Sequence, residues 1–165
     1  MKIGIIGAGA IGHAIAKDLV KAGYQVILSS ESGSVREAAA AAAADVVFVV
    51  ASSRQLSDLP AWGGRIVVDT TNSIGALVPG ARLVKAFNTL PAPLLLADPI
   101  PRAGDRVMFL CGDDQDAKAT VAKIIEAMGF APIDLGTLVE GRKLQQFAAA
   151  SLPSLDLVKF SRRAK

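Results

Sequence analysis

The sequence is short of most features that mark a secreted, membrane-spanning or metal-binding chain. Its single cysteine, Cys111, cannot form an internal disulfide, which favours a reducing compartment and excludes a disulfide-stapled fold. Strongly apolar runs, such as residues 46–51, reach six residues, well below the ~20 that a membrane helix needs. One histidine, His13, is present, and no His/Cys cluster has the spacing of a metal site. We therefore expect a cytoplasmic protein with no membrane segment and no transition metal.

Neither the charge nor the start of the chain indicates a different class. The formal net charge is +3, and much of the basic excess lies in residues 159–165. A nucleic-acid surface needs a basic stripe, preferably with aromatic residues, and aromatics make up 5% of this chain. The apolar start is interrupted by Gly4, Gly7 and Gly9, which argues against a signal peptide. We expect no nucleic acid and no membrane among the partners.

Apolar runs of strand type alternate with helical patterns along the chain, and 52% of the residues are hydrophobic. The predicted strands are residues 2–6, 25–29, 45–51, 65–69, 82–87, 107–111 and 130–134. The predicted helices are residues 12–22, 35–44, 114–128 and 137–150, with an irregular proline-rich segment at 90–102 and a helical tail at about 151–165. This alternation predicts one α/β domain over residues 1–165, with a doubly wound, mostly parallel sheet of the Rossmann type.

The spacing of the first elements adds a detail of topology. Between the strands at residues 25–29 and 45–51 there is room for one helix only. The third edge strand of a dinucleotide-binding sheet is therefore expected to be missing, and the helix at residues 35–44 should cross to the far side of the first strand.

A glycine-rich loop between the first strand and the first helix matches the pattern G-x-G-x-x-G. Its residues are Gly7, Ala8, Gly9, Ala10, Ile11 and Gly12. The first glycine permits the tight turn, the second lets the backbone approach a pyrophosphate, and the third allows close packing of helix and strand. The N-terminus of the helix offers free N–H groups and a partial positive charge. The loop predicts a dinucleotide cofactor.

The end of the second strand bears on the choice between NAD and NADP, and it leaves both open. Glu31 is a carboxylate that could bind a ribose 2′-hydroxyl, although it lies beyond the usual position and could cap the next helix instead. Ser29 and Ser30 can donate hydrogen bonds to a 2′-phosphate, with Arg36 a turn later.

Motifs spread over nearly the whole chain resemble the family of coenzyme F420-dependent NADP oxidoreductases. They are Val-Val-Asp-Thr-Thr-Asn at residues 67–72, Val-Lys-Ala-Phe-Asn-Thr at 84–89, Cys-Gly-Asp-Asp at 111–114, Pro-Ile-Asp-Leu-Gly-Thr-Leu at 132–138 and Arg-Lys-Leu-Gln at 142–145. The resemblance implies hydride transfer between NADP(H) and a deazaflavin or another small-molecule acceptor, and a homodimer. It favours NADP as the cofactor and places the nicotinamide near residues 87–89.

The resemblance also implies where the rest of the cofactor lies. Asn88 and Thr89, just past a strand's carboxyl end, are candidates for orienting the carboxamide or ribose, and Ala51 and Ser52 would lie beside the cofactor backbone. No catalytic acid or base is assigned, because hydride transfer between two rings depends on stacking and exclusion of water. His13 is expected at the helix flank rather than in catalysis.

Other functions stay open from the sequence. A chain with no separate substrate domain could be a non-catalytic dinucleotide sensor or a subunit whose partner supplies the acceptor site. A flavin or ferric reductase module is a further alternative. The apolar stretch at residues 148–160 makes a homodimer plausible.

Overall fold

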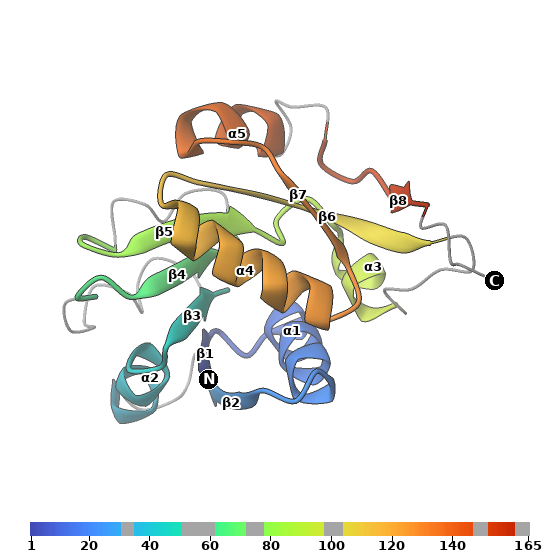
Figure 1. Cartoon of the computed structure of the whole chain (residues 1–165). Helices are drawn as coiled ribbons and strands as arrows, with labels where there is room; N and C mark the ends of the chain where they lie inside the picture. Colours follow the sequence, from blue (N-terminus) through green and yellow to red (C-terminus); the bar gives the residue numbers. More distant parts are fainter. Residues whose placement is uncertain (31–34, 51–61, 72–77, 98–103, 147–151, 161–165) are drawn as a thin grey trace.

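The computed structural model describes residues 1–30, 35–50, 62–71, 78–97, 104–146 and 152–160. Within them, one main sheet has the strand order β2-β1-β3-β4-β5-β6-β7 (Figure 1). The strands are β1 (Lys2–Ile6), β2 (Gln25–Ser29), β3 (Val46–Val49), β4 (Ile66–Asp69), β5 (Arg82–Ala86), β6 (Asp105–Gly112), β7 (Ala131–Asp134) and β8 (Val158–Lys159). The helices are α1 (Ala10–Lys21), α2 (Val35–Ala42), α3 (Ala92–Leu96), α4 (Gln115–Ala127) and α5 (Leu138–Gln145).

Strands β1 to β5 run parallel, which brings their carboxyl ends to one edge of the sheet. Strand β6 pairs antiparallel with β5, and β7 pairs parallel with β6. The carboxyl ends of β6 and β7 therefore lie at the opposite edge, and the start of β6 extends beyond the end of β5. A mostly parallel, doubly wound α/β fold is confirmed.

Helices cover both faces of the sheet, and each face has its own apolar core. On one face, α1, α3 and α4 bury side chains such as Leu19, Leu95 and Ile124 against Phe48 of β3. On the other face, α2 packs against β1 and β2, and its buried alanines share a second core with side chains of β3 and β4 and with the buried Trp62. Helix α5 also lies on this second face, against β6. The parallel strands are thus buried on both sides, as their continuous apolar sequences predict.

The predicted absence of a third edge strand is confirmed for the described residues. Strand β2 is at the edge of the sheet, and β3 pairs with the far side of β1. Helix α2 lies between β2 and β3 in the chain and packs on both β1 and β2.

Two predictions about irregular and terminal segments were wrong. The proline-rich stretch contains helix α3, because Pro91 precedes its first turn, where a missing N–H costs nothing. The residues described after Pro153 form a turn and then β8 rather than a helix, and β8 pairs antiparallel with β6. No helix among the described residues combines the length and the apolar character that crossing a membrane requires.

Candidate dinucleotide-binding site

The glycine loop joins β1 to α1 at the carboxyl edge of the sheet. Gly7 has φ 112°, a conformation that favours glycine, and its N–H donates to the Ser29 carbonyl at 2.9 Å. A Cβ on Gly12 would lie 1.9 Å from the Gly7 carbonyl oxygen, so the helix can approach the turn this closely only with glycine there. Both glycines therefore have the structural roles that the motif predicts.

Gly9 differs from Gly7 and Gly12, the other two glycines of the motif, because it faces open space. It is the N-cap of α1, with φ −73° and ψ −174°, and a Cβ added there would meet nothing within 4 Å. Ala10 is exposed, while Ala8 and Ile11 are half-buried. The free N–H groups in the first turn of this 12-residue helix therefore lie next to the Gly9 backbone. No side chain of the described residues covers the backbone at the place where a Cβ on Gly9 would lie. An anionic group fits this surface.

The lone histidine belongs to the flank of this helix. His13 is exposed, and its Nδ1 lies 3.1 Å from the Gly9 carbonyl oxygen. The contact ties the ring back to the start of its own helix. The position at the helix flank is the one expected from the sequence, and the absence of a catalytic role for His13 stays a prediction.

The residues expected at the adenosine ribose lie at the end of β2. Ser29 is 1% exposed, and its hydroxyl has no hydrogen-bond partner among the described residues. Ser30 follows the strand and is half-buried, so it is nearer the surface than Ser29. Glu31 and the side chain of Arg36 lie outside the described part of the chain.

The ends of β3 and β4 are joined by hydrogen bonds at the same edge. Thr70 donates from its N–H at 3.2 Å and from its Oγ1 at 2.8 Å, both to the Val49 carbonyl. The predicted site residues Ala51 and Ser52 follow β3 but lie outside the described residues. The segment Thr70–Thr71, which was not predicted as part of the site, occupies the corresponding place after β4.

The turn after β5 contains both Asn88 and Thr89 and begins in an unfavourable conformation. Phe87 has φ 67°, which is uncommon outside glycine, and its ring packs edge-on against Phe48 with centroids 5.4 Å apart. Strain of this kind is often found at functional sites and persists only where the surroundings enforce it. The burial of Phe87, with 1% of it exposed, supplies part of that enforcement.

The two predicted residues in this turn make contacts with the C-terminal part of the chain. Asn88 donates from Nδ2 to the Gln145 carbonyl at 2.8 Å, and its Oδ1 is buried without a partner among the described residues. Thr89 is buried, and its carbonyl accepts from the N–H of Ser154 at 2.7 Å. The structure thus gives Asn88 a contact that holds α5, which sequence reasoning did not foresee.

A buried ion pair lies between the ends of β4 and β5. Lys85 Nζ is 3.6 Å from Asp69 Oδ2, and the two side chains are 2% and 4% exposed. Burial lowers the pKa of Lys85 below its usual value, and the carboxylate of Asp69 opposes that shift. Sequence reasoning missed this pair, although a lysine inside an apolar strand and an aspartate at a strand end were signals for it.

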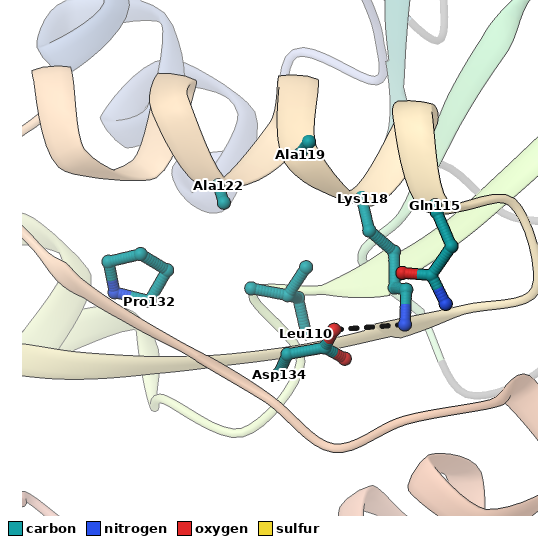
Figure 2. A pocket seen from close by; sticks show the side chains of 7 residues that line it. All are labelled: Leu110, Gln115, Lys118, Ala119, Ala122, Pro132 and Asp134. Atoms are coloured by element: carbon teal, nitrogen blue, oxygen red, sulfur yellow. Dashed lines mark ion pairs between the residues drawn. The ribbon is translucent and has the colours of Figure 1, made fainter.

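A cavity of about 200 Å³ lies between α4 and β7, away from the glycine loop (Figure 2). Its lining is mostly aliphatic and includes Lys118, whose Nζ is 2.9 Å from Asp134 Oδ2. Asp114, at the start of α4, lies 3.9 Å from Arg82 at the start of β5, so this region belongs to the amino edge of the parallel strands. The cavity is therefore not part of the glycine-loop site.

Taken together, the sheet order, the position of the glycine loop and the open N-terminus of α1 define a dinucleotide-binding protein of the Rossmann type. The model of the family described as NADP oxidoreductase, coenzyme F420-dependent, matches residues 2–47 of this chain, which confirms the resemblance to that family over this part. The match covers β1, α1, β2 and α2.

Three known proteins show the extent of the similarity. A crystal structure of the hypothetical protein SMa0349 from Sinorhizobium meliloti is 37% identical, with a TM-score of 0.86 and 96% of each chain covered. Metalloreductase STEAP3 from Rattus norvegicus is 30% identical over 93% of this chain, which spans 37% of that relative's length. A putative F420-dependent NADP-reductase from Arthrobacter sp. FB24 is 22% identical, with a TM-score of 0.68 over 86% of this chain and 87% of the other, and shares the fold.

Proposed function

We propose that this protein is an NADP-dependent oxidoreductase that transfers a hydride between NADP(H) and a flavin-like or deazaflavin acceptor. The observation that carries the proposal is the contrast within the glycine loop. Gly12 is packed against the turn at Gly7, whereas Gly9 has open space where a pyrophosphate would contact the backbone. The family description, which names NADP and coenzyme F420, supports the choice of cofactor and acceptor.

The residues of the chain would divide the cofactor among three places along the carboxyl edge. The first turn of α1 would hold the pyrophosphate, and Ser30, with Glu31 beyond it, would contact the adenosine ribose. The ends of β3, β4 and β5 would receive the nicotinamide half. Asn88 and Thr89 would contact it, and so would Ala51 and Ser52, which follow β3 in the sequence. The cofactor supplies the hydride chemistry, and the protein orients the ring and excludes water.

A second candidate is a module that reduces flavin or ferric complexes. It is favoured by the 30% identity to a metalloreductase, although this chain spans only 37% of that protein. The nucleotide site would be the same in both cases, and the acceptor would differ. A third alternative is a dinucleotide sensor, or a subunit, that has no turnover of its own. Cofactor binding without oxidation of NADPH by either acceptor would indicate it.

The site is tested with Gly9→Val. The backbone at Gly9 is extended, and the added side chain enters open space, so we expect the thermal midpoint to stay close to that of the wild type. We expect NADPH affinity to fall, because losing one charge-assisted hydrogen bond costs about 1.5–3 kcal/mol, or about 10–100-fold in Kd. Fluorescence titration measures Kd, and unchanged affinity would refute the site.

The glycine that is packed rather than open provides the matched variant. Gly12→Ala places a Cβ against the Gly7 carbonyl, so we expect a loss of about 1–3 kcal/mol of folding stability.

The acceptor is tested by measuring turnover of the wild-type protein with NADPH and with NADH against coenzyme F420, free flavin and a ferric complex. Oxidation of NADPH with the deazaflavin alone supports the first proposal, and oxidation with the ferric complex supports the second.

We also propose a homodimer and a cytoplasmic location. Leu155, Leu157 and Phe160 are exposed near the end of the described chain, and burial of such side chains favours self-association. Cys111 is a free, buried thiol, which fits a reducing compartment.

A further inference from the structure

Lys85 is an unusual residue for the interior of a parallel sheet. Its side chain is 2% exposed, on the face of β5 that is covered by α5, and its neighbours in the strand are apolar. Burying an ammonium group is costly unless a carboxylate and further hydrogen bonds compensate it. A leucine at this position would avoid that cost. The role of the ammonium group is therefore to be found in the groups to which it donates hydrogen bonds.

Lys85 and Asp69 together hold one residue, Thr71. The Asp69 Oδ1 atom accepts from the Thr71 N–H and from the Thr71 hydroxyl, both at 2.8 Å. The Lys85 ammonium donates to the Thr71 carbonyl. The pair therefore binds both the backbone N–H and the backbone carbonyl of Thr71, immediately after β4, at the carboxyl edge where the nicotinamide half would lie.

We propose that Lys85 is a positioning residue of the cofactor site: with Asp69 it fixes the Thr70–Thr71 segment in the shape that receives the nicotinamide half of NADPH. The inference rests on the proposed function, because it concerns the same cofactor. Thr70 is tied to the end of β3 through the Val49 carbonyl, so the held segment is anchored to two strands. A site whose backbone is fixed before binding loses less freedom when the cofactor enters.

The chain contains a second buried lysine that serves as a control. Lys118 is 5% exposed and pairs with Asp134 at 2.9 Å, but this pair lies between α4 and β7 at the opposite edge of the sheet (Figure 2). Replacing either lysine removes a buried ammonium group from its carboxylate partner, which is 47% exposed for Asp134 and 4% exposed for Asp69. Of these two lysines, Lys85 is the one that contacts the segment after β4, whereas Lys118 donates to the Gly136 carbonyl.

The test measures the Kd for NADPH in the full chain for the wild type, Lys85→Met, the double variant Asp69→Asn/Lys85→Met, and Lys118→Met. The double variant removes both charges, and the asparagine retains an acceptor for Thr71. We expect it to fold and to bind NADPH about tenfold more weakly, because the Thr71 carbonyl loses its donor and the segment is less well oriented. We expect Lys118→Met to bind NADPH as the wild type does.

The pH dependence gives a readout that a purely structural role would not move. The charged and titratable groups that face Lys85 are Asp69 from β4, Cys111 from β6 and Arg142 from α5. Because burial lowers the Lys85 pKa, the ammonium is lost at a pH below the usual lysine range. We expect the wild-type Kd to rise on that alkaline side and Lys85→Arg to bind NADPH without this rise, since arginine stays protonated.

The outcomes separate the inference from the function on which it rests. Wild-type affinity in the double variant, equal weakening in Lys118→Met, or an alkaline rise that persists in Lys85→Arg would each overturn the role of Lys85 while NADPH binding stands. A wild-type chain that does not bind NADPH would remove the proposed function itself. If Lys85→Met fails to fold, the double variant and the pH profile still decide.

Discussion

At the scale of single residues, Cys111 lies in β6 with no exposed surface. Gln145 donates from Nε2 to its sulfur at 3.3 Å, and Gly141 of α5 packs directly on it. Burial raises the pKa of the thiol to about 11, because the thiolate would lose its hydration, while the nearby Lys85 acts in the opposite direction. The neutral thiol therefore predominates at every pH below that value.

We predict that the folded protein does not react with a thiol reagent such as DTNB at pH 8. The thiolate is the nucleophile, and here it is both scarce and covered. In guanidinium chloride the thiol pKa returns to its ordinary range, and we expect one equivalent to react rapidly. The rate of absorbance change in the two solutions checks this, and fast labelling without denaturant would show that α5 does not cover β6.

The glycine loop could be predicted from the sequence because each glycine answers a local requirement of the backbone. Gly7 needs its positive φ, and Gly12 needs the absence of a Cβ. The pair of Asp69 and Lys85 could not be predicted in the same way, because it depends on the pairing of β4 with β5. A charge inside an apolar strand shows only that some partner is needed.

At the scale of elements, α5 packs on the sheet through a close approach of its backbone to β6 rather than through a wide apolar face. Thr137 caps its first turn, accepting from the Glu140 N–H. A Cβ on Gly141 would lie 2.2 Å from the Cys111 Cβ and 2.6 Å from its sulfur. The helix also delivers the Gln145 carbonyl to Asn88. Its distance from β6 therefore affects the turn after β5.

We predict that Gly141→Ala destabilises the protein by about 1–3 kcal/mol, the usual cost of overpacking. In an exposed helix the same change would stabilise by about 0.8–1 kcal/mol, so a loss is a sign of the contact and not of helix propensity. Urea unfolding followed by circular dichroism measures it. Val139→Ala, on the exposed side of α5, is the control and should stay within about 0.5 kcal/mol of the wild type.

The elements that the sequence predicted well are those whose pattern is complete within the element. Strands β1 and β2 have the bounds that were predicted from the sequence, and α4 begins directly after its cap, Asp114. Strand β8 is two residues long and forms because β6 extends far enough to pair with it. Arg106 of β6, 7% exposed, also binds Asp156 at 2.7 Å. Such long-range contacts leave no local periodicity.

At the scale of the whole molecule, the C-terminal part of the chain closes over the β6 side of the carboxyl edge. The Ser154 N–H bonds to the Thr89 carbonyl, and β8 adds to the start of β6 (Figure 1). A Cβ on Gly104 would meet the Lys159 carbonyl at 2.3 Å, so the segment lies close against the start of β6. Its backbone is bound to the domain, while several apolar side chains point outward.

These outward side chains lead to a prediction about assembly. Phe160 is 78% exposed, and in a symmetric dimer each substitution would count twice. Burying a phenylalanine contributes about 1.5–3 kcal/mol, so we expect Phe160→Lys to weaken the proposed dimer by about 100-fold or more in Kd without lowering the thermal midpoint of the monomer. Light scattering coupled to size exclusion measures the mass over a dilution series.

The control is Val20→Lys, which changes an equally apolar side chain, 60% exposed, near the end of α1. A lysine there is compatible with the helix dipole, so the fold should be unaffected. We expect this variant to assemble as the wild type does. A wild-type protein that is monomeric at all concentrations would rule out the dimer, and a Phe160→Lys dimer as tight as the wild type would place the interface elsewhere.

Because Thr89 is bonded to the same C-terminal segment, a dimer formed through Phe160 would also hold the turn after β5, and weaker NADPH binding on dilution would follow from it.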